Sequence, residues 1–280
     1  MEQKSQNIFD LAADRFYYFA AEHMRRRAKK KSRFTNMSVP MDDLIGVRLF
    51  STGSFESTQI EGLTSYLKTK GRSGVMLDIG ANIGVYSVAF APFFQKIYSF
   101  EANPVTFKLF DANLHLSAID NVQPLNIALS NQAGSGTIYV PKNGNLGWAS
   151  MVVGHHPAAV DEVVIQKDTL DGVLAKLDVQ PSQVRLIKMD VEGHELSVLE
   201  GARETLSRHK PDILCEVLTS EAGAPVLSFL KEIGYSRFRT FKRVISPWGK
   251  CSIVLQDIDP AAAGHTALVL ATADTGEAGH

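Results

Sequence analysis

Acidic residues stand at the ends of four apolar stretches in this chain. Asp78 follows the apolar residues 75–77, and Glu101, Asp190 and Glu216 close three later stretches. Short apolar stretches of this kind predict buried strands, and a carboxylate is costly to bury without a compensating partner. The four acids therefore predict a site for a ligand that carries positive charge and hydroxyl groups.

The turn after Asp78 has the composition of a ligand-binding turn. Gly80 and Gly84 can adopt positive φ and leave room for a ligand against the backbone, and Asn82 also tolerates the left-handed region. Apolar residues follow from position 85, so we expect a strand, a turn and a helix whose N-terminus faces the ligand. The alternative is an ordinary strand-to-helix turn without a ligand.

Glu101 helps to distinguish between the nucleotide-like ligands that could bind here. At the end of the second strand, a carboxylate accepts hydrogen bonds from a ribose diol. The dinucleotide fingerprint GxGxxG is absent, because the chain reads Gly80-x-Asn82-x-Gly84 with an acid before the first glycine. That acid would repel a pyrophosphate, whereas the sulfonium and amino groups of S-adenosylmethionine (SAM) are cationic. The pattern therefore favours SAM over a dinucleotide.

Strands and helices alternate from residue 75 onward. This alternation predicts an α/β fold with a doubly wound, mostly parallel sheet and right-handed crossovers. In such a sheet, ligands bind beyond the carboxyl ends of the strands. The expected strands are 75–78, 96–100, 122–127, 137–140, 163–167, 186–189 and 213–215, and the expected helices are 60–70, 85–93, 104–116, 170–176, 196–208 and 224–233. The sequence leaves open whether the pair 237–240 and 252–256 or the segment 266–271 ends the sheet.

The chain resembles one known family. Between residues 73 and 235 it carries, in order, LDIGANIGVYS, FEANP, NIALSN, LIKMDVEGHELSVLEGA and PDILCEV. In this combination it is similar to the FkbM-type SAM-dependent methyltransferases. The resemblance implies a Rossmann-like class I methyltransferase fold, whose seven-stranded sheet has one antiparallel strand. It also implies O-methylation of a hydroxyl on a sugar or a small natural product. Ala102 is a mild departure from the family pattern.

The glycine turn and the helix after it are expected to hold one end of SAM. The turn would form the floor under the methionine and ribose portions, and the first helical residues would contact the ligand carboxylate. The residues assigned to this end are Asp78, Gly80, Asn82, Gly84, Tyr86 and Ser87.

The remaining cofactor contacts are expected at later strand ends. Glu101 would accept hydrogen bonds from the ribose diol, with Asn103 beside the ribose or adenine. Asn126 and Ala128 would flank the adenine ring. Asp190 would lie where the methyl group leaves, although its position also suits a helix N-cap.

Methyl transfer to an alcohol needs a group that removes the hydroxyl proton. Asp190, Glu192 and His194 share the run DVEGHE and are the catalytic candidates, with Glu192 favoured because the family motif has an acid there. A histidine titrates near neutral pH, but His194 could equally be an exposed residue of the first helical turn. His155 and His156, on the long loop 141–160, are rival bases unless they are simply exposed.

Several other charged residues also have predicted roles. Lys188 should be buried and paired with an acid such as Glu216. Asp168 and Asp171 could line the acceptor side. A divalent metal held by Asp190, Glu192 and Glu216 has little support, so no metal is predicted.

The composition of the chain limits its possible partners and its location. The chain has 280 residues and a net charge of −1, so its overall charge does not indicate nucleic-acid binding. Cys215 and Cys251 are too few for a disulfide framework, and Cys215 should be a buried free thiol. No signal-peptide pattern opens the chain and no apolar run is long enough to span a membrane. The expected location is the cytoplasm.

Three segments follow from these patterns. They are a helical N-terminal extension at 1–70, a SAM-dependent methyltransferase domain at 71–257, and a last strand with a flexible tail at 258–280. The basic run 25–33 could be a solvated helix end, a membrane-surface or polyanion contact, a lid or a dimer contact. The expected acceptor is a small molecule or saccharide, and a homo-oligomer is an option. Acceptor specificity is expected to reside in the loop 141–160 and in the N-terminal 70 residues. The alternatives are a methyltransferase acting on RNA, protein or a membrane-linked glycan, a non-catalytic SAM-binding protein, or a nucleotide oxidoreductase.

Overall fold

The computed structural model describes most of the chain. The described residues are 19, 26, 34, 36–40, 43–71, 73–142, 146–155, 159–217, 220–246, 248–249, 251–258 and 267–273. The helix predicted within 1–33, the basic run 25–33, His156 and the tail beyond 273 lie outside them, apart from Phe19 and Arg26. Within the described ranges, no helix has both the length and the apolar character needed to cross a bilayer.

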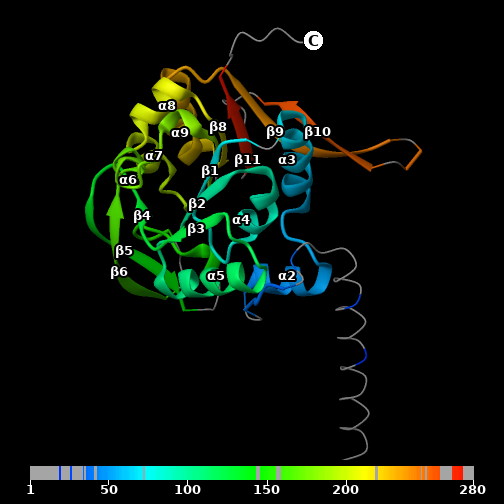
Figure 1. Cartoon of the computed structure of the whole chain (residues 1–280), viewed down its shortest axis with the longest axis horizontal. Coiled ribbons are helices and arrows are strands. Elements are labelled where there is room, and N and C mark those ends of the chain that lie inside the picture. The colour runs from blue at the N-terminus through cyan, green and yellow to red at the C-terminus, as the bar shows by residue number, and fades with distance from the viewer. Residues whose placement is uncertain are drawn as a thin grey trace, which may run out of the picture.

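The main sheet has eight strands in the order β3-β2-β1-β7-β8-β11-β9-β10 (Figure 1). Strands β3, β2, β1, β7 and β8 are parallel. Strand β11 runs antiparallel to β8 and β9, and β10 runs antiparallel to β9. Their bounds are β1 Val75–Ile79, β2 Lys96–Phe100, β3 Val122–Leu125, β7 Val184–Met189, β8 Asp212–Val217, β9 Arg237–Ile245, β10 Cys251–Asp257 and β11 Ala267–Thr272.

The predicted fold class is confirmed, with one strand more than the resemblance implied. The sequence left open which late segment ends the sheet. In the structure, all three join it, as β9, β10 and β11, and β11 lies between β8 and β9. Strand β10 is the addition. Among the described residues, it pairs only with β9 at the sheet edge, and most of its own residues are exposed. Without β10, the sheet has the expected seven strands with one antiparallel strand.

A second sheet of three strands lies beside the main one. It consists of β4 Ala128–Leu129, β6 Val160–Asp168 and β5 Gly134–Pro141, in that order. The strand predicted over 122–127 is therefore too long, because β3 ends at Leu125 and Ala128 belongs to the second sheet. The long hairpin of β5 and β6 carries the 141–160 loop, which contains the short 3-10 helix η2 Leu146–Trp148.

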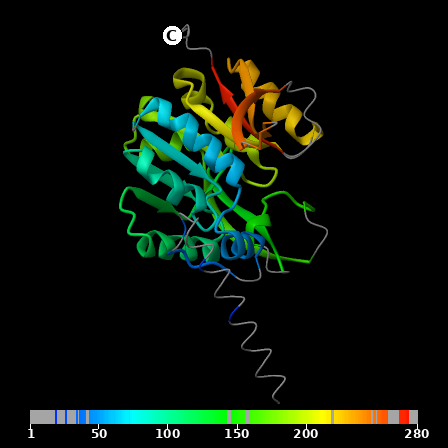
Figure 2. The ribbon, with the colours of Figure 1, turned by 90° about the vertical axis from the view of Figure 1, so that its right-hand side faces the viewer.

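Helices cover both faces of the main sheet (Figure 2). Side chains of alternate strand residues point to opposite faces, so Met76 packs with one helical layer and Leu77 with the other. One layer contains α2 Leu44–Thr52, α3 Ser57–Lys70, α4 Val85–Phe90 and α5 Pro104–Leu116. The other contains α6 Leu170–Lys176, α7 Glu195–Glu200, α8 Arg203–His209 and α9 Ser220–Glu232.

The helix predicted over 196–208 is divided into α7 and α8. The break is at Gly201, whose carbonyl accepts a hydrogen bond from the Asp171 backbone N–H at 3.1 Å. A Cβ at Gly201 would lie 2.0 Å from the Ser130 carbonyl oxygen. The helix is therefore interrupted where two other segments approach its backbone closely, a contact that spacing along the chain does not reveal.

The N-terminal helices belong to the same core as the strands. The Asp43 side chain caps α2 by accepting a hydrogen bond from the Ile45 N–H at 2.6 Å. Ile45 and Leu63 then pack with Phe90. The division of the chain at residues 70 and 257 stays a prediction. In the structure, side chains before residue 70 pack with side chains after it. Strand β11, which follows residue 257 in the chain, lies between β8 and β9 in the main sheet.

Candidate active site

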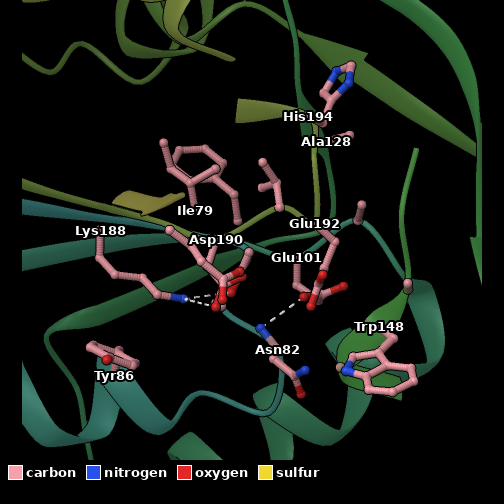
Figure 3. Close-up of a pocket in the computed structure, with 18 of the residues that line it drawn as sticks. Ile79, Asn82, Tyr86, Glu101, Ala128, Trp148, Lys188, Asp190, Glu192 and His194 are labelled. Carbon is pink, nitrogen blue, oxygen red and sulfur yellow. Dashed lines mark hydrogen bonds and ion pairs between the residues drawn. The ribbon is translucent and has the colours of Figure 1, made fainter. Parts of the chain in front are cut away.

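A cavity of about 220 Å³ opens at the carboxyl ends of β1, β2, β7 and β8. This is the edge of the sheet at which the four strand-end acids were expected to meet a ligand. The side chains of Glu101, Asp190 and Glu192 turn toward a common centre, while Lys188 and Trp148 lie on opposite sides of it (Figure 3). The predicted residues that line the cavity are Gly80, Asn82, Tyr86, Glu101, Ala128, Asp190, Glu192 and His194.

Asp78 and Ser87 lie behind the cavity wall. Both side chains are fully buried, and the Ser87 hydroxyl donates a hydrogen bond to Asp78 Oδ2 at 2.6 Å. The cause is strand alternation: Leu77 and Ile79 face one layer of helices, so Asp78 points to the other layer, beneath α4. The structure therefore gives these two residues a supporting position rather than the expected contact with SAM.

Asn103 and Asn126 are also outside the cavity lining. Asn103 caps α5, where its side-chain oxygen accepts a hydrogen bond from the Val105 N–H at 3.0 Å. The Asn126 amide donates to the carbonyl oxygens of Glu101 and Ala102, at 2.8 and 3.2 Å. Both asparagines thus hold the end of β2 in place. Their expected contacts with the ribose and adenine stay predictions.

The glycines of the turn are required by contacts within the protein. Gly80 has φ 74°, and a Cβ there would lie 1.8 Å from the Asp190 carbonyl oxygen. Gly84 has φ 92°, and a Cβ there would lie 2.3 Å from the Phe110 ring. Gly84 does not line the cavity. Gly84 therefore makes room for α5, whereas Gly80 makes room for the residue after β7 and also lines the cavity, where its contact with a ligand stays a prediction.

Glu101 is held at one end of the cavity by two backbone groups. Its carboxylate oxygens accept hydrogen bonds from the Asn82 N–H at 2.9 Å and the Asn103 N–H at 2.8 Å. Asn82 adopts the left-handed φ of 51° that this contact needs. Burial raises the pKa of Glu101 to about 7. Each carboxylate oxygen can accept further hydrogen bonds, so this rigid corner can still receive the two hydroxyls of a ribose.

Lys188 supplies the positive charge of the cavity. It is buried, and its Nζ lies 3.5 Å from Asp190 Oδ2, 3.8 Å from Asp78 Oδ1 and 4.8 Å from the centre of the Tyr86 ring. Burial alone would lower the pKa of Lys188, but Asp190 and Asp78 outweigh that effect and raise it. The predicted burial is confirmed. The ion pairs, however, go to Asp78 and Asp190 rather than to Glu216.

Three carboxyl groups meet next to Lys188. Asp190, Glu192 and Glu216 each place an oxygen within 4.8 Å of the other two. Burial, followed by repulsion from Asp190, raises the pKa of Glu192 to about 8 and that of Glu216 to about 9. These carboxyls could jointly reach a cation, but their raised pKa values favour protons on Glu192 and Glu216 at neutral pH.

The two candidate histidines that the structure describes, His155 and His194, occupy different places. His194 lines the cavity with its Nε2 3.1 Å from the Ser130 hydroxyl, and it lies apart from the carboxyl groups (Figure 3). Burial lowers its pKa. His155 is only 23% exposed, and its Nε2 lies 3.4 Å from Glu192 Oε2. Neither histidine is exposed. His155, on the 141–160 loop, is the one that contacts the candidate base Glu192.

The 141–160 loop is attached to the end of β7. The Ser150 hydroxyl donates a hydrogen bond to the Glu192 carbonyl oxygen at 2.7 Å. Trp148 and Met151 from the same loop line the cavity. A long loop with an aromatic residue is a sequence signal for a functional segment, and the structure places this one over the carboxyl groups.

Asp168 and Asp171 do not line the cavity. Asp168 pairs with Lys176, and this pairing, together with a hydrogen bond from the Thr169 backbone, lowers its pKa although burial acts in the opposite direction. Asp171 accepts hydrogen bonds from the backbone and hydroxyl of Thr205 at 3.0 and 2.6 Å. Their expected role on the acceptor side is therefore replaced by structural contacts around α6.

Sequence reasoning expected the N-terminal 70 residues to contribute to acceptor specificity, but it named none of the residues there that line the cavity. Leu44, Ile45, Phe55 and Glu56 line it, and all four precede the first strand of the sheet. No motif marks them, because the turn around residue 55 has no spacing that predicts a site. Backbone geometry is the better signal, because Glu56 has φ 44° and such left-handed non-glycine residues concentrate at functional sites.

Comparison with known proteins shows the family of this chain. The model of the methyltransferase FkbM domain matches residues 78–237. Methyltransferase sdnD of Sordaria araneosa is 32% identical over 159 residues, which are 46% of this chain and 60% of that protein. Methyltransferase 1 of Beauveria bassiana is 28% identical over 145 residues, which are 45% of this chain and 57% of that protein. The chain thus spans less than two thirds of each of these relatives.

Solved structures show a weaker likeness. Methyltransferase FkbM from Methylobacillus flagellatus KT is 15% identical with a TM-score of 0.42, over 92% of this chain and 60% of that chain. SMU.1697c from Streptococcus mutans, in complex with SAH, is 14% identical with a TM-score of 0.43, over 76% of this chain and 97% of that chain. Both TM-scores are low, so the assignment depends on the family match. Because that match covers residues 78–237 of 280, the chain belongs to the FkbM methyltransferase domain family.

Proposed function

We propose that this protein is a SAM-dependent O-methyltransferase that acts on a hydroxyl of a sugar or small natural product. The observation that carries the proposal is the cavity itself. It joins a rigid acceptor of hydroxyl groups, Glu101, to a group of carboxyls at the ends of β7 and β8. One end therefore suits a nucleoside, and the other suits proton removal.

The cofactor end fits SAM in its chemistry. Glu101 presents a buried carboxyl to a ribose diol, and Ile127 and Ala128 offer apolar surface for an adenine ring. Gly80 lines the same wall without a side chain, next to Asp190. The carboxyl groups around this wall favour a cationic ligand. When bound there, SAM would supply a methyl group that its sulfonium releases readily.

Glu192 is the best-placed residue to accept the proton of the acceptor hydroxyl. Its side chain faces the cavity beside Asp190, and its raised pKa gives it the basicity of a general base near neutral pH. His155 contacts the same carboxyl and can exchange a proton with it. Asp190 and His194 remain catalytic candidates. His194 lies farther from the carboxyl groups than Asp190 does, and its ring nitrogen contacts the Ser130 hydroxyl instead.

Alignment of the two reactants would supply much of the rate. Holding both in a reactive geometry contributes roughly 7–11 kcal/mol in ideal cases. Lys188 and Asp190 fix the charged wall of the cavity, and Trp148 closes its opposite side. These residues therefore orient the acceptor and limit water, while Glu192 accepts the proton. A saccharide acceptor, a homo-oligomer and a cytoplasmic location stay predictions.

Two measurements test this function. Isothermal titration should show binding of SAM and not of NAD, and Glu101→Ala should weaken SAM binding at least tenfold. Labelled SAM, incubated with the protein and a panel of methyl glycosides and small phenolic or polyol natural products, should give a methyl ether identified by mass. Glu192→Ala should reduce turnover with little change in SAM affinity. If SAM does not bind and Glu101→Ala changes nothing, the proposal is wrong.

A further inference from the structure

Glu56 is a cavity residue that lies outside the part of the chain matched by the family model. It precedes residue 78, where the match begins, and lies between α2 and α3. It nevertheless lines the same cavity as Glu101 and Asp190. The N-terminal segment of this protein therefore adds a carboxylate that the family match does not account for.

The backbone at Glu56 is in an unfavourable state. Its φ and ψ are 44° and 45°, in the left-handed region that non-glycine residues seldom adopt. Glu56 also occupies the N-cap position of α3 but makes no side-chain cap hydrogen bond. Serine, threonine, aspartate, asparagine and glycine are preferred at that position, and Gly53, Ser54 and Ser57 are all close by in the chain. Local stability does not explain a glutamate here.

The side chain of Glu56 points to the cavity rather than to its own helix. Its Oε2 accepts a hydrogen bond at 2.6 Å from the Tyr86 hydroxyl, whose ring lies 4.8 Å from Lys188 Nζ. Within the described part of the chain, this is the one hydrogen bond that the Glu56 side chain makes, while its backbone carbonyl accepts one from the Ile60 N–H at 3.0 Å. Its second oxygen, Oε1, can therefore accept a hydrogen bond from a molecule in the cavity.

Glu56 lies at the acceptor end and not at the cofactor end. Glu56 contacts Tyr86, whose ring lies 4.8 Å from Lys188 Nζ. That Nζ lies 3.5 Å from Asp190 Oδ2, which belongs to one of the three carboxyl groups at the ends of β7 and β8. Glu101, in contrast, is held by Asn82 and Asn103. A group that donates a hydrogen bond to Glu56 would therefore belong to the acceptor.

We infer that Glu56 is an acceptor-binding residue that accepts a hydrogen bond from a hydroxyl group of the methyl acceptor. The N-terminal segment then determines acceptor specificity, while the family-matched segment supplies the cofactor site and the base. The acceptor class is a polyhydroxylated molecule, because Glu56 and the carboxyl groups at the ends of β7 and β8 line the same cavity. This inference rests on the proposed function, since it assigns a substrate contact to that same site.

A stability measurement tests whether Glu56 is merely structural. Tyr86→Phe, and Tyr86→Phe combined with Glu56→Gly, are compared by thermal unfolding without any acceptor. Glycine adopts φ 44° without strain, and removing both hydrogen-bond partners together leaves no buried group unsatisfied. The double variant should therefore melt at the same temperature as Tyr86→Phe or higher. A melting temperature lower by 5 °C or more would show that Glu56 supports the fold, and would overturn the inference.

A kinetic measurement tests the contact itself. The probe is the methyl glycoside or polyol that the wild-type protein methylates fastest in the panel described above. Glu56→Gln keeps an oxygen for Tyr86 but replaces the charged acceptor in the cavity with an amide, so the acceptor KM should rise about tenfold. The Kd for SAM should stay within twofold. The control is Glu61→Gln on α3, an exposed residue paired with Arg243 away from the cavity.

The outcomes separate this inference from the proposed function. If the wild-type protein binds SAM and methylates the probe, but Glu56→Gln leaves the acceptor KM unchanged, the inference is wrong and the function stands. A fall in kcat at constant acceptor KM would also overturn it, because it would place Glu56 in the chemical step. If the wild-type protein does not bind SAM, the function fails, and the thermal comparison still decides whether the fold requires Glu56.

Discussion

His155 Nε2 lies 3.4 Å from Glu192 Oε2, although the two residues come from loops of different sheets. His155 belongs to the loop between β5 and β6, and Glu192 follows β7 of the main sheet. Ser150 joins the same two loops through its hydrogen bond to the Glu192 carbonyl oxygen. The candidate base is therefore oriented by the second sheet as well as by its own strand.

The pH dependence of methyl transfer should follow the ionisation of Glu192. Burial raises its pKa to about 8, and only the carboxylate form can accept the acceptor proton. Turnover should therefore rise as the pH increases through about 8, and Glu192→Gln should remove that rise. A profile that is identical in the wild-type and Glu192→Gln proteins would exclude Glu192 as the base.

Gly80→Ala should unfold more easily than a matched glycine variant. The added Cβ would meet the Asp190 carbonyl oxygen at 1.8 Å, and φ is 74°. We expect a loss of about 2–4 kcal/mol in the free energy of unfolding, measured by urea denaturation. Gly71→Ala is the control, because Gly71 has φ 72° but nothing within 4 Å of the added atom. Equal losses of unfolding free energy in the two variants would mean that the close approach of Gly80 to the Asp190 carbonyl does not contribute to stability.

Lys188→Met should destabilise the fold strongly. The ammonium group is buried between Asp78 and Asp190, and its removal leaves two carboxyl groups without their counter-charge. Breaking a buried ion pair in this way costs about 3–5 kcal/mol. Chemical denaturation measures the loss. Combining Lys188→Met with Asp78→Asn should recover part of it, whereas a purely additive double variant would contradict this pairing.

The stability of the protein should fall as the pH rises through the range in which Glu216 loses its proton. Burial, then repulsion from Asp190, raises its pKa from 4.5 to about 9 in the folded state. The folded state thus holds a proton that the unfolded state has released. Stability is therefore greatest below the unfolded pKa and declines toward the folded pKa. Unfolding at pH 5, 7 and 9 should show this decline, and Glu216→Gln should make it shallower.

Much of the fold could be predicted from the sequence because the evidence for it is local. The turn of Gly80, Asn82 and Gly84 shows in residue types that permit positive φ. The alternation of apolar strands and helices indicates a parallel sheet, and the place of Glu101 after the second strand puts it at the edge where the cavity opens. These features depend on neighbours within a few positions, so the sequence alone was sufficient for the fold class and for the edge of the sheet at which the cavity opens.

The tertiary structure decided which residues reach that cavity. Asp78 is excluded because strand alternation turns it beneath α4, and Asn126 is excluded because it holds the backbone at the end of β2. Glu56 and His155 enter the site from segments far away in the chain. The physical reason is the same in each case. The direction of a side chain and the approach of distant segments depend on packing across the whole core, which spacing along the chain does not specify.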